Sequence, residues 1–168
     1  MSQDFKDIFG DWQPSDDDTP DDAPASERKL DEKEVKVLGV FEHAEVGSER
    51  ADPQTFVLLQ DRRERKVPIR IGRFEAFAIS TALHNEQLDR PMTHDLIRLL
   101  FERLGIKLES VIIDDLWQDT FYAKLCITWG SDHQDIDCRP SDAIAIAVRM
   151  KAPIYVAESV FETVDPQP

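Results

Sequence analysis

The stretch Arg139–Val148, RPSDAIAIAV, decides the fold. Pro140 lacks an N–H group and has a preset φ, so it suits the first turn of a helix. Ser141 and Asp142 are expected to accept backbone N–H groups there, and a carboxylate at that end also interacts favourably with the helix dipole. The alternation of Ala with β-branched residues would also fit a strand. The capping residues decide for a helix.

The same helix is expected to be buried. Arg149 and Lys151 suit its C-terminal end, and Pro153 marks its stop. A helix that is apolar on every side lies in a core, and its three alanines allow a sheet to approach closely. Its N-terminus is also a place where anions are easily held.

The rest of the chain predicts strands and further helices around this central helix. Strands are expected at 35–41, 55–59, 66–71, 108–114, 120–129, 135–138 and 153–156, and helices at 74–84 and from the N-cap Thr93 to the C-cap Gly105, with a short helical end after the last strand. Pro68 places its strand near a sheet edge. The order βββ-αα-βββ-α-β predicts a single α+β domain, residues 35–163, with a mixed sheet packed by helices and a tail at 164–168.

The charge of −14 is unevenly distributed. Residues 1–34 hold 12 acids and 4 bases, whereas residues 35–168 hold 22 acids and 16 bases. Residues 13–29 are dominated by Asp, Pro, Ser and Ala, so this acidic tail is predicted to be disordered. Since the folded part is not basic either, any binding of DNA or RNA is expected to be weak.

The start of the tail carries a helical pattern. Its apolar residues recur at i, i+3, i+4 and i+7: Phe5, Ile8, Phe9 and Trp12. Two interpretations stay open, a motif that folds onto a protein partner or onto its own domain, and an apolar terminus without a ligand.

Several classes of protein are excluded. No apolar run approaches the roughly 20 residues that span a bilayer, and residues 1–20 lack the apolar core of a signal peptide. Two cysteines without a CxxC motif argue against a disulfide framework or a zinc site, so a cytoplasmic location is expected. Cys126 and Cys138 flank a turn expected at 130–134 and are expected to lie across from each other, either as a redox pair or as two buried thiols.

Two helix starts share one pattern, Arg-Pro followed by a hydroxyl residue and Asp. Such residues are common caps, but a cation beside a helix N-terminus is unfavourable, so Arg90 and Arg139 each require a carboxylate partner or a phosphate-like ligand. Phosphodiester hydrolysis needs oxygen ligands for Mg²⁺ or Mn²⁺, a base, and cations that offset phosphate charge. The acids Asp142, Asp95, Asp137 and Glu75 supply the first two, and His94 is a candidate proton donor or acceptor.

A cluster of bases lies in the turn and second strand of the first hairpin and just after it. It comprises six of the domain's 16 bases within 12 residues: Arg62, Arg63, Arg65, Lys66, Arg70 and Arg73. The cluster is either a phosphate-contacting patch, a solvated hairpin tip, or a surface that binds the acidic tail of the same chain.

With these motifs the domain resembles the bifunctional nuclease family. The resemblance rests on 67–72 (VPIRIG) with Glu75-Ala76, 90–96 (RPMTHDL), 120–123 (TFYA), 137–145 (DCRPSDAIA) and 153–156 (PIYV), and covers roughly residues 35–163. It implies an α+β domain, and DNase and RNase activity, which has been reported for some family members. The acidic extension lies outside the family domain.

These patterns together predict a metal-assisted nuclease of low sequence specificity that acts on DNA, RNA or both. The predicted catalytic residues are Asp142, Asp95, Glu75 and His94; substrate binding is assigned to Arg90, Arg139, Ser141, Arg70 and Arg73, and the metal to Asp142 and Asp137. The alternative is a non-catalytic binding or regulatory module in which the same motifs are caps and ion pairs. A homo-oligomer is expected, because the Pro68 strand is an edge that needs covering.

Overall fold

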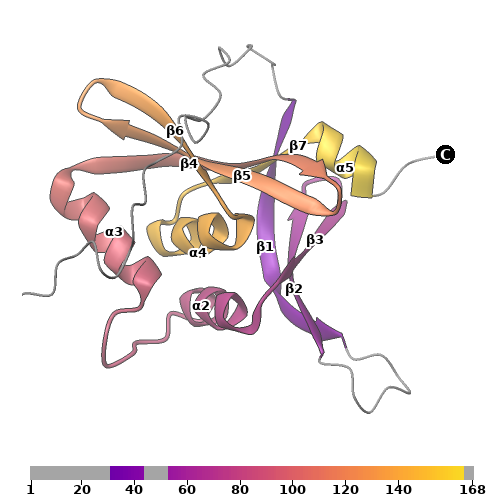
Figure 1. Ribbon diagram of the computed structural model, residues 1–168, viewed down its shortest axis with the longest axis horizontal. Helices are drawn as coiled ribbons and strands as arrows, with labels where there is room; N and C mark the ends of the chain where they lie inside the picture. The colour runs from indigo at the N-terminus through magenta and orange to yellow at the C-terminus, as the bar shows by residue number, and fades with distance from the viewer. Residues whose placement is uncertain (1–30, 44–52, 165–168) are drawn as a thin grey trace, which may run out of the picture.

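The computed structural model describes residues 31–43 and 53–164, so the predictions for residues 1–30 of the acidic extension 1–34 lie outside the described residues. The described chain forms one sheet and a set of helices (Figure 1). The strands are β1 (Glu32–His43), β2 (Gln54–Asp61), β3 (Lys66–Ile71), β4 (Ile106–Trp117), β5 (Thr120–Trp129), β6 (Asp132–Cys138) and β7 (Ile154–Ala157), and the helices are α2 (Arg73–Leu83), α3 (Thr93–Leu104), α4 (Pro140–Met150) and α5 (Glu158–Val164). The α+β class and the order of elements are confirmed.

The sheet is mixed, with the strand order β3-β2-β1-β7-β4-β5-β6. Only β4 and β7 are parallel; the other neighbouring strands are antiparallel. Its two halves run in different directions in Figure 1, with β1–β3 descending the view and β4–β6 crossing it. The strand that contains Pro68 is at the edge of the sheet, where a residue without an N–H group is tolerated because there is no further strand to bond.

Helix α4 occupies the centre of the fold. It packs against β4 and β5 on one side and against α2 and α3 on the other (Figure 1). The five residues 143–147 are each at most 3% exposed. Because three of them are alanines, the helix can approach all of its neighbours closely, as the sequence predicts. None of the helices in the described residues combines the length and apolar character needed to cross a membrane.

The helix ends are partly as expected. Pro140 is the first residue of α4, and Gly105 ends α3 with a φ of 69°. The N-cap of α3 is Met92 rather than Thr93, because the Asp95 carboxylate accepts the Met92 N–H at 2.9 Å. No side-chain cap closes the start of α4. The expected capping roles of its second and third residues are therefore wrong, and the Asp142 carboxylate is bound elsewhere.

The two cysteines do not face each other. Cys126 lies opposite Asp135, and Cys138 lies opposite Ala123. Strand β6 begins at Asp132, so the turn is shorter than predicted and the register moves with it. Both thiols are free, and burial raises their pKa values to about 11 and about 12.

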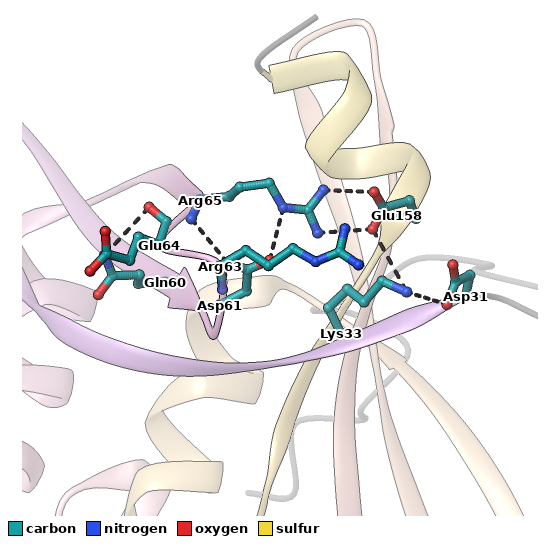
Figure 2. A network of polar contacts seen from close by, with 8 residues as sticks. All are labelled: Asp31, Lys33, Gln60, Asp61, Arg63, Glu64, Arg65 and Glu158. Atoms are coloured by element: carbon teal, nitrogen blue, oxygen red, sulfur yellow. Dashed lines mark hydrogen bonds and ion pairs between the residues drawn. The ribbon is translucent and has the colours of Figure 1, made fainter. Parts of the chain in front are cut away.

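One base of the hairpin cluster is part of the fold. Figure 2 shows the Arg65 guanidinium between Asp61 (Nε–Oδ2 2.8 Å) and Glu158 (Nη1–Oε1 2.6 Å and Nη2–Oε2 2.9 Å). It also lies 4.1 Å from the centre of the Phe161 ring. These contacts join the β2–β3 hairpin to α5 at the start of that helix. Arg62, by contrast, is exposed and pairs with Glu34.

Candidate active site

The starts of α2 and α4 border two hollows, of about 460 and 790 Å³, that share the lining residues Arg70, Ile71, Gly72 and Asp119. The first hollow is also lined by Glu75, Arg139 and Ser141, and the second by Arg73. We call this region the α2–α4 groove. Strand β3 delivers the chain to one helix start and β6 delivers it to the other.

Arg139 links the two helix starts. Its guanidinium donates to Asp142 through Nε (2.7 Å to Oδ2) and Nη2 (3.0 Å to Oδ1), and to Glu75 through Nη1 (3.3 Å to Oε1). The Arg139 side chain is nevertheless 67% exposed. A cation at a helix start is thus held by two carboxylates and still accessible from the groove.

His94 supports this arrangement from α3. Its Nε2 lies 3.1 Å from Oδ1 of Asp142, and the side chain is 13% exposed. Nδ1 is buried and has no hydrogen-bond partner in the described part of the chain. A proton on Nδ1 would be buried without an acceptor, so the geometry favours the tautomer that donates from Nε2 to Asp142.

Asp142 is thereby held as a carboxylate. Burial opposes its ionisation, but the hydrogen bonds from Arg139 and His94 outweigh burial and keep the pKa of Asp142 below its usual range. Neither Asp142 nor His94 lines the hollows. These two residues therefore lie behind the guanidinium and fix its position.

Glu75 depends on a glycine. A Cβ atom at Gly72 would overlap with Oε2 of Glu75, so the Glu75 carboxylate occupies space that only a glycine leaves vacant. Glu75 has one long contact with Arg139, whereas Asp142 has two shorter ones. It is accordingly the less constrained of the two carboxylates.

Asp119 is a groove residue that the sequence reasoning missed. It lies in the turn between β4 and β5 with a φ of 60°, and it lines both hollows. Asp tolerates this left-handed conformation better than most residues, so its presence in a turn is unremarkable from sequence. Only the tertiary structure brings it beside the α2 start.

Three of the predicted site residues lie elsewhere. Asp95 pairs with Arg149 (Oδ1–Nε 2.7 Å), and Arg90 lines a separate hollow. Asp137 lies on β6 opposite Lys124. The groove therefore gathers Glu75, Arg139, Ser141, Arg70 and Arg73, with Asp142 and His94 behind them.

The carboxylates beside the groove are of the right type to bind Mg²⁺ or Mn²⁺. As placed, however, Glu75 and Asp142 both bind the Arg139 guanidinium, which occupies the position between them. Within residues 31–43 and 53–164, no three His, Cys, Asp or Glu side chains gather as metal ligands. In this arrangement the residues do not fit a divalent cation.

The chain is similar to several known proteins. An uncharacterized protein of Mycobacterium tuberculosis (strain ATCC 25618 / H37Rv) is 41% identical over 128 residues, which cover 76% of this chain and 73% of that protein. Bifunctional nuclease 2 of Oryza sativa subsp. japonica is 31% identical over 111 residues, covering 64% of this chain and 34% of the rice protein. Bifunctional nuclease 2 of Arabidopsis thaliana is 29% identical over 101 residues, covering 58% and 31%.

The chain thus spans about a third of the plant relatives' length. The model of the bifunctional nuclease domain matches residues 57–167, a segment that holds both helix starts and every residue named in the α2–α4 groove. The chain belongs to the bifunctional nuclease domain family.

Proposed function

We propose that the chain is a nuclease of low sequence specificity that hydrolyses phosphodiester bonds of RNA or DNA in the α2–α4 groove. The observation that carries the proposal is the exposed Arg139 guanidinium, held between Glu75 and Asp142 at the wall of the groove. The printed names of the plant relatives support the reaction class.

The basic side chains of the groove suit a phosphate backbone. Arg70 and Arg73 are exposed and line the hollow of about 790 Å³, and Arg139 lines the hollow of about 460 Å³. A guanidinium binds phosphate oxygens through two parallel hydrogen bonds and stabilises the charge that develops during phosphoryl transfer. Contacts of this kind recognise the backbone and not the bases, so they predict low sequence specificity.

Glu75 is the groove's best candidate for the general base. It takes a proton from a water molecule, the water oxygen forms a bond to phosphorus, and the bond to the leaving oxygen breaks. The leaving oxygen receives its proton from solvent in the open groove. Asp142 and His94 act as positioning residues that hold Arg139 in place.

Dependence on Mg²⁺ or Mn²⁺ is predicted from the sequence alone, and the groove residues as placed do not fit either ion. Weak nucleic-acid binding is expected, because the net charge of the chain is −14 and only a few arginines offset phosphate charge. A cytoplasmic location and a homo-oligomer that covers the edge strand β3 also stay predictions.

The test is degradation of single-stranded RNA and DNA by the purified full chain in Mg²⁺, in Mn²⁺ and in EDTA. Glu75→Gln should lower kcat/KM about 100-fold or more, in the range of a lost general base. Arg103→Gln, on the exposed end of α3, is the matched control and should change nothing. Activity that survives Asp142→Asn combined with Arg139→Ala would identify a contaminant and refute the proposal.

A binding module is the second candidate. Its support is that Asp142 and Asp95 are engaged in ion pairs with Arg139 and Arg149, as structural roles require. It predicts that RNA binds and is recovered intact in all three conditions.

A further inference from the structure

Another hollow, separate from the two hollows of the α2–α4 groove, has the features of a ligand site. It measures about 450 Å³ and lies among the C-terminal ends of α2 and α4, the segment that follows α2, and α3. It shares no lining residue with the groove. It accounts for Arg90, the predicted substrate-binding residue that the groove does not include.

The hollow is basic in a strongly acidic chain. Its lining contains four cationic and two anionic side chains: Arg90, Arg98, Arg149 and Lys151, against Glu86 and Asp95. The dipole of α4 explains a cation at its end, such as Arg149 or Lys151. It does not explain Arg90 in the loop before α3. Arg98, within α3, pairs with Glu102 one turn further along the same helix. We call this region the basic hollow.

Arg149 forms a fixed anchor at this site. The side chain is 6% exposed, and Asp95 holds its Nε. Its Nη1 donates to the carbonyl oxygens of Ala78 (2.9 Å) and Ala145 (3.0 Å). These three bonds engage Nε and Nη1 and leave Nη2 out. A charged side chain that is already immobilised can bind an anion without a further loss of conformational entropy.

Asp95 is kept charged as the partner of Arg149. Burial opposes ionisation of Asp95, but the Met92 N–H and Arg149 outweigh it and hold the pKa of Asp95 below its usual range. The carboxylate therefore continues to fix the guanidinium across the physiological pH range.

The remaining walls offer an apolar face and polar donors. Leu88, Leu99 and Val148 supply the apolar part, and Asn85 lies beside them. Lys151 caps α4 with a φ of 56°, a conformation in which glycine is usual. A lysine at this cap gives the hollow a fourth cation at some cost in backbone energy.

We propose that the basic hollow binds a phosphate monoester of a small organic molecule of about the size of a nucleoside monophosphate. Arg149 and Arg98 are paired with Asp95 and Glu102, whereas Arg90 and Lys151 form no ion pair within the described residues. The two positive charges of Arg90 and Lys151 match a phosphate dianion, and the apolar wall matches an organic substituent. The volume lies within the range of small-molecule sites, roughly 300–1,000 Å³. A nucleic-acid backbone is less suited, because a single hollow of this size contacts one phosphate group.

The experiment is a binding titration of the full chain with adenosine monophosphate and with inorganic phosphate, followed by calorimetry or NMR. Arg90→Gln combined with Lys151→Gly removes two charges, and glycine suits the positive φ of residue 151. This variant should bind adenosine monophosphate at least about tenfold more weakly, since each charge-assisted hydrogen bond contributes more than a tenfold change in affinity. The control, Arg103→Gln with Lys107→Gln, removes two nearby bases outside the hollow and should bind normally.

Adenosine monophosphate should bind more tightly than inorganic phosphate, and high salt should weaken both. Glu75→Gln should leave binding unchanged, because the groove is a separate site; the inference therefore stands or falls apart from the nuclease proposal. Unchanged affinity in the Arg90 and Lys151 variant, or loss of affinity in Glu75→Gln, would overturn the assignment. Equal affinities for inorganic phosphate and adenosine monophosphate would refute the claim that the apolar wall binds an organic substituent.

Discussion

Substituting Gly72 by Ala tests the role of Glu75 without removing the carboxylate. The backbone at Gly72 has φ −76° and ψ 164°, an extended conformation that alanine adopts readily. The added Cβ would overlap with Oε2 of Glu75, whereas Cδ of Glu75 is at an ordinary contact distance of 3.4 Å. The carboxylate must therefore turn away while the helix stays in place.

The expected loss of activity is large compared with the loss of stability. Restoring a normal contact requires the carboxylate oxygen to retreat by on the order of 1 Å. A misplacement of that size costs up to about 100-fold in rate when the displaced group takes part in the reaction. An N-cap change from glycine to alanine costs at most about 1 kcal/mol of stability. Gly72→Ala should thus lower kcat/KM about 10- to 100-fold and leave the fold intact.

The assay combines kinetics on single-stranded RNA with urea unfolding of the same preparations. Gly72→Ala, Glu75→Gln and the double variant form a cycle, in which the double variant should be no less active than Glu75→Gln alone. Wild-type activity in Gly72→Ala would refute the positioning of Glu75 by Gly72. Losses that add in the double variant would show that Gly72 acts through another residue.

Three further outcomes follow from the contacts described above. Arg65→Ala should lower the free energy of unfolding in urea by about 2–4 kcal/mol, because it leaves the buried Asp61 carboxylate without its cation. Arg62→Ala, which removes an exposed ion pair, should lower it by less than about 1 kcal/mol. Equal losses would contradict the structural role of Arg65. Arg149→Met should destabilise the protein at pH 7. Folding lowers the pKa of the partner carboxylate Asp95, so the ion pair stabilises the protein above pH 3.8, and this stabilisation is lost as the pH falls below that value. The difference in free energy of unfolding between the variant and the wild type should therefore be smaller in unfolding curves at pH 3. The two free thiols, with pKa values raised by burial to about 11 and about 12, should react with iodoacetamide at pH 7.5 far more slowly in the folded protein than in urea, and equal rates would show that they are not protected.

Much of the fold was accessible from sequence because local chemistry and tertiary packing agree. Pro140 at a helix start and an apolar run without a polar face leave little alternative to a buried helix. The edge position of β3 follows from Pro68, whose missing N–H excludes a central strand. The register of β5 and β6 could not be predicted in the same way, since it depends on a turn whose length no residue pattern specifies.

The site was predictable only in part, for a related reason. The sequence identifies Arg90 and Arg139 by the same Arg-Pro motif, yet they line different hollows. Besides Asp142, Arg139 binds a second carboxylate, that of Glu75 on another helix, and no local spacing relates Glu75 to Arg139. Capping patterns report what a helix start can bind, whereas tertiary packing decides which partner is present.

The position of β7 has a consequence for how the chain assembles during synthesis. The strands β1–β3 and β4–β6 each form a hairpin-linked group of local antiparallel pairs, and the last strand in sequence joins the two groups through Val35 and Val111. Until Ile154–Ala157 leaves the ribosome, a nascent chain can hold only two separate half-sheets, each with an uncovered inner edge. Closure must then bring together strands that are distant in sequence, which is the slow kind of pairing. Truncations that remove β7 are therefore expected to aggregate through those edges and not to yield a smaller folded domain.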